Sequence, residues 1–223
     1  MNRNHEPART AYQAGRLKEA FDIWRLAAES GDAEAQCWLG SLYANGEGIG
    51  VDDAAALRWY LAAARQGNHM AQANVGAFLF MGRGTEKDPE EAVRWLTQAA
   101  NGDDLNGLFN LAVLYSRGEG RPADHGKAAT LYRRAAELGH YPSQSRLGYL
   151  YAQGQGVPKD RVQAYLWLSL ASQHGIGTAL NALESVVKEM SAEEKAKGLA
   201  LFEEWRGRTR STDGPTALYP MPA

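Results

Sequence analysis

The chain has 223 residues, of which 44% are hydrophobic, and it carries a formal net charge of −2 with a mean hydropathy of −0.45. No apolar run approaches the roughly 18 residues needed to span a bilayer, so we expect no membrane insertion. The nearly balanced charge argues against nucleic-acid binding, which needs a basic stripe. Cys37 is the only cysteine, which excludes an intrachain disulfide and a cysteine-rich metal site; we interpret it as a small packing residue.

The N-terminal residues 1–30 are predicted to form a helical hairpin or cap with a tight turn at Gly15. The segment from Met1 to Thr10 is polar and lacks the apolar core of a secretory signal. We therefore expect a cytoplasmic protein, or a periplasmic one if a leader has been removed.

From Ala27 onward the sequence repeats with a period of 36 residues. The period is visible in an alanine column, a mainly tryptophan column, two glycine columns and an aspartate column. In that order, these are Ala27, Ala63, Ala99, Ala135 and Ala171; Trp59, Trp95, Leu131 and Trp167; Gly46, Gly82, Gly118 and Gly154; Gly48, Gly84, Gly120 and Gly156; and Asp52, Asp88, Asp124 and Asp160. A period of about 20 to 50 residues indicates units that bury their apolar faces only against their neighbours.

Each unit is predicted to be a helix-loop-helix hairpin. In the first, Ala33–Ala44 carries an apolar stripe at helical spacing. Gly46 is predicted to end this helix in the left-handed conformation. Asp52 is predicted to cap a second helix with its side chain. The four full units are predicted at residues 31–66, 67–102, 103–138 and 139–174.

A small residue recurs in the middle of the first helix of each unit, and the members of this column are Gly40, Gly76, Ala112 and Gly148. Glycine inside a helix costs about 0.5–1 kcal/mol relative to alanine, so its recurrence indicates close approach between helices. The aromatic side chain at the Trp59 position is predicted to fill the space between the helices. Loss of Trp95 is then expected to cost about 3–5 kcal/mol.

The C-terminal residues 175–206 are predicted to form a partial repeat and a capping helix. Thr178–Glu189 resembles one more first helix, and Ser191 to Glu194 has the S-x-x-E pattern of a capping box. Three side chains of the last helix are predicted to cover the final repeat: Leu199, Phe202 and Trp205. Residues 207–223 are predicted to be a flexible tail, and the local arginines Arg206, Arg208 and Arg210 make it either a solvated or a docking segment.

The repeat resembles the SEL-one-like repeat (SLR), a relative of the tetratricopeptide repeat. The resemblance depends on the segments Leu39–Tyr43, Gly46–Gly48 and Ala56–Ala63 with Asp52 and Gly67, and it extends over roughly residues 9 to 205. It implies an all-α fold, a right-handed α-solenoid of stacked hairpins. The third unit departs from the pattern at Ala112, Leu131 and Asp103. The inter-repeat glycine, which should stand at position 103, is expected to have moved to Gly102.

The resemblance also implies a non-catalytic scaffold or adaptor that binds a protein or peptide partner. In related superhelices the first helix lines the concave side, so the positions where the repeats differ would form the groove floor. These are Trp38, Ser41, Asn45, Asn74, Met81, Asn110, Arg117, Arg146, Tyr149 and Gln153. Asparagines there would bond to a peptide backbone, arginines would pair with carboxylates, and Trp38, Met81 and Tyr149 would be apolar anchors. Two alternatives are a variable solvated face, and a core that Trp38 and Tyr149 simply extend.

The residue patterns of catalysis are missing from the sequence. There is no H-E-x-x-H, no G-x-S-x-G and no phosphate-binding G-x-x-x-x-G-K-[ST], so we predict no enzyme, no metal and no cofactor. The histidines His140 and His174 fall at hairpin junctions and are expected to have capping or surface roles. An alternative function is a dedicated inhibitor or immunity protein that blocks an effector enzyme. An enzyme is a third hypothesis, and we expect a monomer or weak homodimer.

Overall fold

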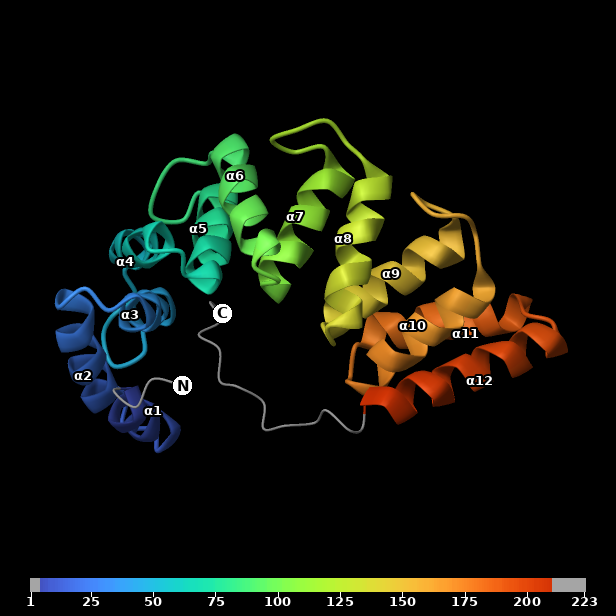
Figure 1. Cartoon of the computed structure of the whole chain (residues 1–223), viewed down its shortest axis with the longest axis horizontal. Coiled ribbons are helices and arrows are strands. Elements are labelled where there is room, and N and C mark those ends of the chain that lie inside the picture. Colours follow the sequence, from blue (N-terminus) through green and yellow to red (C-terminus); the bar gives the residue numbers. More distant parts are fainter. Residues whose placement is uncertain (1–4, 210–223) are drawn as a thin grey trace. The chain divides into compact units, whose positions relative to one another are not determined.

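The computed structural model describes residues 5–209, which form twelve helices and no strand (Figure 1). The helices are α1 (Glu6–Gln13), α2 (Leu17–Glu29), α3 (Ala33–Asn45), α4 (Asp53–Arg65), α5 (His69–Met81), α6 (Pro89–Asn101), α7 (Leu105–Arg117), α8 (His125–Glu137), α9 (Tyr141–Gln153), α10 (Arg161–Gln173), α11 (Gly177–Glu189) and α12 (Ala192–Thr209). The prediction of an all-helical chain is confirmed.

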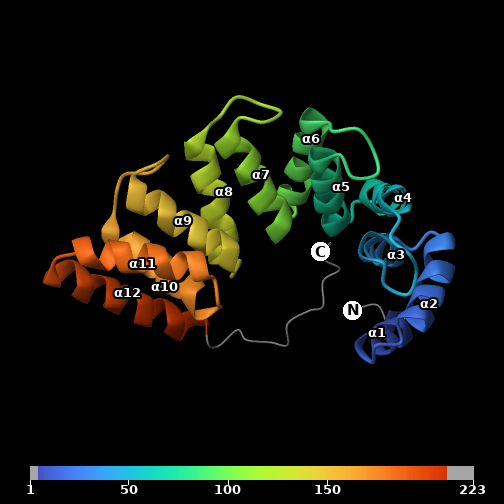
Figure 2. The ribbon, with the colours of Figure 1, turned by 180° about the vertical axis from the view of Figure 1, so that it is seen from behind.

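The helices pack as hairpins stacked in chain order. Helices α3 and α4 form one hairpin, α5 and α6 the next, and α9 and α10 another, while α4 packs on α5 and α8 packs on α9. Figures 1 and 2 show this succession from two sides. The described residues divide into two compact units, residues 5–110 and residues 111–209, and each is treated separately below. The predicted stack of hairpins is confirmed.

Aspartate and asparagine side chains cap the N-termini of many of the helices. The predicted caps of the second helices are confirmed: Asp52 accepts a hydrogen bond from the Ala55 N–H at 2.8 Å, and the other three aspartates of the column do the same in their own hairpins. A second set of caps starts the first helices at Asp32, Asn68 and Asp104. This second set was not predicted, although its members also stand 36 residues apart.

The two glycines of the loop within a hairpin have different structural roles. The first, such as Gly46 with φ +72°, ends the first helix in the left-handed conformation that favours glycine. The second lies against the backbone carbonyl of the first residue of an earlier helix, and the pairs are Gly48 with Leu17, Gly84 with Asp53, and Gly156 with His125. A Cβ on any of these glycines would overlap that carbonyl group. Helix termination therefore explains the first glycine of the Gly-x-Gly pattern, and packing between hairpins explains the second.

The predicted close approach at the glycines in the middle of the first helices is confirmed, but the side chain that causes it is different. A Cβ on Gly40 would lie 2.7 Å from Tyr60 Cδ1, and one on Gly148 would lie 2.7 Å from Leu168 Cγ. The prediction that the Trp59 position fills this space is wrong, since Tyr60 is fully buried while Trp59 is only partly buried. The filling residue is the next one along the helix, which faces the first helix directly.

A buried glutamine joins consecutive hairpins. The Nε2 groups of Gln36, Gln72 and Gln144 donate to the carbonyls of Ala28, Ala64 and Ala136, each at 3.2 Å. These carbonyls belong to the last turn of the preceding second helix, where helices leave acceptors unpaired. The bond thus satisfies a buried acceptor at the point where one hairpin meets the next.

The junction between the second and third hairpins keeps the pattern of the other junctions. Asp103 has φ +58°, the left-handed conformation that Gly67 and Gly139 adopt at the equivalent positions. The expectation that the glycine has moved to Gly102 is therefore wrong: Gly102 has φ −91°, and Asp103 itself makes the turn. Aspartate tolerates this conformation better than most residues.

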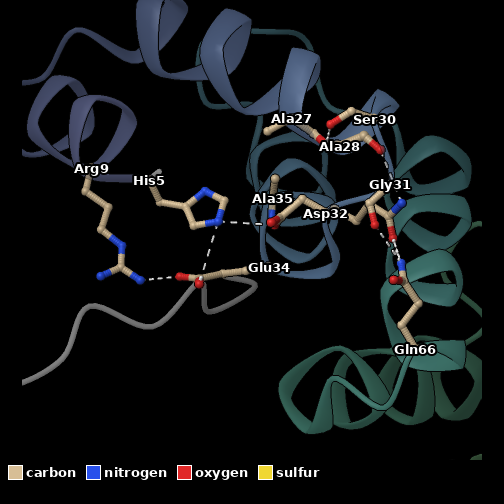
Figure 3. A network of polar contacts seen from close by, with 11 residues as sticks. His5, Arg9, Ala27, Ala28, Ser30, Gly31, Asp32, Glu34, Ala35 and Gln66 are labelled. Carbon is tan, nitrogen blue, oxygen red and sulfur yellow. Dashed lines mark hydrogen bonds and ion pairs between the residues drawn. The ribbon is translucent and has the colours of Figure 1, made fainter. Parts of the chain in front are cut away.

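A polar cluster attaches α1 to the first complete hairpin (Figure 3). His5 is 1% exposed, and its Nε2 atom lies 3.2 Å from Asp32 Oδ1 and 3.8 Å from Glu34 Oε2. Arg9, one turn along α1, forms an ion pair with the same Glu34. The ion pair between Arg9 and Glu34 therefore attaches α1 to the first turn of α3, and the buried His5 ring packs beside it.

The other end of the stack is closed by α12. The predicted capping box is confirmed: the Ser191 N–H donates to Glu194 Oε2 at 2.7 Å, and the Glu194 N–H donates to Ser191 Oγ at 3.1 Å. Phe202 is buried, and Trp205 meets Trp167 edge-on with 4.8 Å between ring centroids. Leu199 does not cover the repeat as predicted, since it is 51% exposed.

The last helix extends further than the sequence predicted. Helix α12 continues to Thr209, so residues 207–209 are helical rather than part of a flexible tail. Residues 210–223, which include Arg210, lie outside the described residues.

Candidate interaction surface

We use the term first-helix face for the ten positions on α3, α5, α7 and α9 that the sequence assigns to a groove. Six of them lie in residues 5–110: Trp38, Ser41, Asn45, Asn74, Met81 and Asn110. Four lie in residues 111–209: Arg117, Arg146, Tyr149 and Gln153. Each unit therefore carries its own part of the face, and the two parts are described in turn.

Trp38 belongs to the core of the N-terminal unit. It is 4% exposed and stacks on Trp24 with 4.6 Å between ring centroids and 2° between ring planes. Tyr12 packs against both rings. Ser41, one turn further along α3, is also buried. Trp38 thus offers almost no surface to a partner, in agreement with the alternative in which it extends the core.

Asn74, like Trp38, offers almost no surface to a partner. It is 5% exposed, and its Nδ2 atom is buried without a hydrogen-bond partner. A buried polar group left unpaired costs about 1–3 kcal/mol. Met81, two turns further along α5, is 53% exposed. In this unit Met81 is therefore the side chain of the face that is most accessible to a partner, and it offers a flexible apolar contact.

The C-terminal part of the face is open to solvent. Arg117, Arg146, Tyr149 and Gln153 are all exposed, Tyr149 by 49%. Arg117 makes one weak ion pair with Glu119, at 3.6 Å. Tyr149 follows Arg146 by three residues on α9, so the two side chains share one face of that helix. The role of these residues in binding stays a prediction.

The polar groups elsewhere are explained by packing. Burial raises the pKa of the Cys37 thiol, which keeps it protonated and unreactive. The His174 ring stacks on Tyr141 at the end of α10, and burial lowers the pKa of His140 to about 4. Within residues 5–209 no group of three metal-binding side chains comes together, and no helix is long and apolar enough to cross a membrane.

These features define a helical repeat protein with the SLR fold. The chain belongs to the Sel1 repeat family, whose model matches residues 17–32, 33–68, 69–104, 105–140 and 142–176. The four full repeats begin two or three residues after the predicted unit boundaries, at the first residue of a first helix or one residue later. No curated protein matches the chain.

Several solved structures are similar to the chain. A protective antigen present in uropathogenic Escherichia coli strains, which displays an SLR fold, matches 90% of the chain with 29% identity and a TM-score of 0.79. The match covers 45% of that antigen, so the chain spans less than half its length. A Sel1 repeat protein from Oxalobacter formigenes matches 93% of the chain and 84% of its own length, with 28% identity and a TM-score of 0.76. A putative Sel1 repeat protein from Klebsiella pneumoniae, 21% identical over 81% of the chain and 89% of its own length, shares the fold with a TM-score of 0.55.

Proposed function

We propose that this protein is a non-catalytic scaffold that binds a protein or peptide partner through the first-helix face, the side expected to be concave in this family. Proteins built from such repeats typically mediate protein interactions. The proposal adds to this general role the kind of partner and the surface that binds it.

One observation carries the proposal: the residues that recur every 36 positions are used in packing or capping, whereas the exposed residues of the first-helix face differ between repeats. Gly48, Gly84 and Gly156 pack on backbone carbonyls, and the aspartates of the second-helix column cap helices. Met81, Arg117 and Gln153 occupy one register position, are all exposed and differ in chemistry. A surface of this kind is suited to recognition of a specific sequence, since each repeat can contact a different partner residue.

The side chains of the face fit a polypeptide better than a small molecule. Met81 and Tyr149 are exposed apolar groups, of the kind enriched at protein interfaces. Asn110, which is only partly buried, carries an amide that can bond to an extended backbone. Within each unit the face is divided between successive first helices, so a bound segment could contact more than one of them.

The test is affinity capture from the native host followed by quantitative mass spectrometry. Met81→Ser and Tyr149→Ser remove apolar surface from the face. The matched controls Leu26→Ser and Leu199→Ser remove leucines that are at least as exposed as Tyr149, 63% and 51%, from helices α2 and α12. We expect the face variants to reduce capture of the main partner at least about fivefold and the controls to leave it unchanged. Equal capture by all four variants would overturn the proposal.

A further inference from the structure

Two positively charged side chains lie over one aromatic ring where the loop between α7 and α8 leaves and re-enters the helices (Figure 1). The guanidinium carbon of Arg121 lies 3.7 Å from the centroid of the Tyr115 ring, and Lys127 Nζ lies 5.7 Å from the same centroid. Both are cation–π distances, and the shorter one is van der Waals contact with the ring. All three residues belong to the unit of residues 111–209, so one ring holds both charges near each other.

Hydrogen bonds fix the backbone around this ring. The Asp124 N–H donates to the Tyr115 carbonyl at 2.9 Å, which joins the end of the loop to the helix that carries the ring. Asp124 Oδ1 in turn accepts from the Lys127 N–H at 2.9 Å, so this carboxylate caps α8. The ring, the loop and the first turn of α8 therefore form one connected platform.

The guanidinium group of Arg121 is partly buried, yet no carboxylate pairs with it in the part of the chain that the structure describes. The two acidic residues nearest in sequence are paired elsewhere. Glu119 lies 3.6 Å from Arg117, and Asp124 lies 3.4 Å from Lys127. A guanidinium group that rests against a ring keeps the N–H donors at its edge available, and it loses less freedom when it binds a ligand. Arg121 thus offers a positive charge and a planar set of donors.

Neither cation is part of the repeat. The equivalent positions in the other three full repeats carry no positive charge; they are Ile49, Thr85 and Val157 for Arg121, and Ala55, Glu91 and Gln163 for Lys127. The tyrosine, in contrast, recurs as Tyr43 and Tyr151. Stacking of the hairpins therefore requires no cation at these two positions, which favours a role in binding.

The arrangement suits a carboxylate ligand. The guanidinium edge matches the two oxygens of a carboxylate and binds it through two parallel hydrogen bonds. Lys127 adds positive potential, because its exposed pair with Asp124 contributes little. The two ion pairs of this segment balance each other in charge, so Arg121 leaves one net positive charge. A single carboxylate neutralises that charge, whereas a phosphate group with about two negative charges would exceed it.

We propose that Arg121, stacked on Tyr115 and assisted by Lys127, binds an aspartate or glutamate side chain of the partner protein. The contact lies on the loop between α7 and α8 and not on the first-helix face, so it adds a second point of attachment. The inference rests on the proposed function for the source of the carboxylate. Binding of the carboxylate itself can be measured without the partner.

The experiment is a titration of the full chain with short peptides, followed in heteronuclear NMR spectra. The probes are N-acetyl-Ala-Glu-Ala-amide, its glutamine counterpart and its phosphoserine counterpart, all at constant ionic strength. The readout is the Nε–Hε signal of Arg121, or the backbone amide of Lys127 where Arg121 is replaced. Arg121→Gln removes the binding group, Tyr115→Leu removes the ring, and Tyr115→Phe keeps it. The matched control is Arg58→Gln, since Arg58 is exposed on α4 and lies over no ring among the described residues.

We expect the glutamate peptide to shift the Arg121 signal saturably and to bind at least about tenfold more tightly than the glutamine peptide. Arg121→Gln and Tyr115→Leu should abolish this preference, whereas Tyr115→Phe and Arg58→Gln should retain it. The spectra also show whether each variant is folded, and Arg121→Gln keeps the test decisive if Tyr115→Leu unfolds.

Three outcomes would overturn the inference: equal shifts with the glutamate and glutamine peptides, equal shifts of the Arg58 and Arg121 signals, or tighter binding of the phosphoserine peptide. Each of them would leave the first-helix face unaffected, because that surface is tested by capture of the partner with the Met81 and Tyr149 variants. Equal capture by those variants and their leucine controls would instead overturn the proposed function.

Discussion

Gly84 lies directly against the backbone carbonyl of Asp53, the first residue of α4, so a Cβ on this glycine would overlap the carbonyl group. The loop after α5 is thereby seated on the start of a helix in the preceding hairpin. Gly67, by contrast, has φ +85° but nothing within 4 Å of its Cβ position. Both glycines have a positive φ, but only Gly84 is packed against another backbone, so a comparison of the two positions distinguishes packing from backbone conformation.

This contrast predicts the effect of alanine at each position. Gly67→Ala should lower the free energy of unfolding by about 1–2 kcal/mol, the cost of a left-handed alanine. Gly84→Ala should carry a similar cost for its φ of +66° and an overpacking cost of about 1–3 kcal/mol in addition. Urea unfolding followed by circular dichroism measures both. Equal losses for the two variants would show that the loop is not seated as described.

Trp38 and Tyr149 are predicted to differ sharply, although the sequence assigns both to the same face. Trp38→Ala removes a buried ring that stacks on Trp24 and should lower the free energy of unfolding by about 3–5 kcal/mol. Tyr149→Ala removes a side chain that is 49% exposed. Its effect on stability should stay within about 0.5 kcal/mol.

Thermal or urea unfolding gives the stabilities, and Trp38→Phe serves as the conservative variant. If Trp38→Phe kept most of the stability but lost the partner, Trp38 would contribute to binding as well as to the core.

His140 is predicted to make stability depend on pH. Burial lowers its pKa from 6.5 to about 4 in the folded chain, so between these values the unfolded chain binds more protons. The contribution of neutral His140 to the free energy of unfolding is therefore fully present above pH 6.5 and is lost as the pH falls towards 4. His140→Asn should remove this loss.

The same substitution should also improve the start of α9. His140 is the N-cap residue but makes no side-chain bond to the backbone of α9. Asn68, at the equivalent position of α5 two repeats earlier, accepts from the Ala71 N–H at 2.9 Å. His140→Asn should thus raise stability at pH 7 by about 0.5–1 kcal/mol. Urea titrations of the wild type and variant between pH 4.5 and pH 8 measure both effects. Parallel pH profiles of the two proteins would contradict the predicted pH dependence. A lower urea midpoint of the variant at pH 7 would contradict the predicted gain from the new N-cap.

The repeat period was sufficient to predict the hairpins because each 36-residue unit makes nearly the same local contacts. The caps at Asp52 and its equivalents, the glycine at Gly46 and the capping box at Ser191 depend on neighbours a few residues away. Local chemistry of this kind can be read from spacing alone. The recurrence of Gly48 and its equivalents is visible in the sequence, but only the structure shows that these glycines contact an earlier helix.

The candidate site was harder to predict, since helical periodicity gives the direction of a residue but not what covers it. Trp38 has the register of the first-helix face, yet Trp24 and Tyr12 of the N-terminal helices enclose it. Likewise, Tyr60 and Trp59 are adjacent, and only packing shows which of them faces Gly40. The glutamines Gln36, Gln72 and Gln144 occupy matching positions of their repeats, but the sequence does not show which carbonyls they bind.

The polar cluster at the N-terminus gives the last prediction. His5 is 1% exposed and lies 3.2 Å from Asp32, whose side chain also caps α3 through the Ala35 N–H (Figure 3). His5→Ala removes the imidazole but leaves the cap, so α1 should detach more often while α3 remains formed. Removing one partner of a buried polar contact costs about 1–3 kcal/mol, and most of this cost should appear locally.

Native-state hydrogen exchange resolved by mass spectrometry distinguishes this local effect from global unfolding. Amides of α1 should exchange about tenfold faster or more in His5→Ala, since each 1.4 kcal/mol corresponds to a factor of ten. Amides of α9 should be unaffected. Glu19→Ala is the control, because it removes an exposed ion pair with Arg16 at 2.7 Å, which contributes little. Equal acceleration of α1 and α9 would show that His5 supports the whole stack rather than its first helix, because α1 would then open only together with the repeats that follow it.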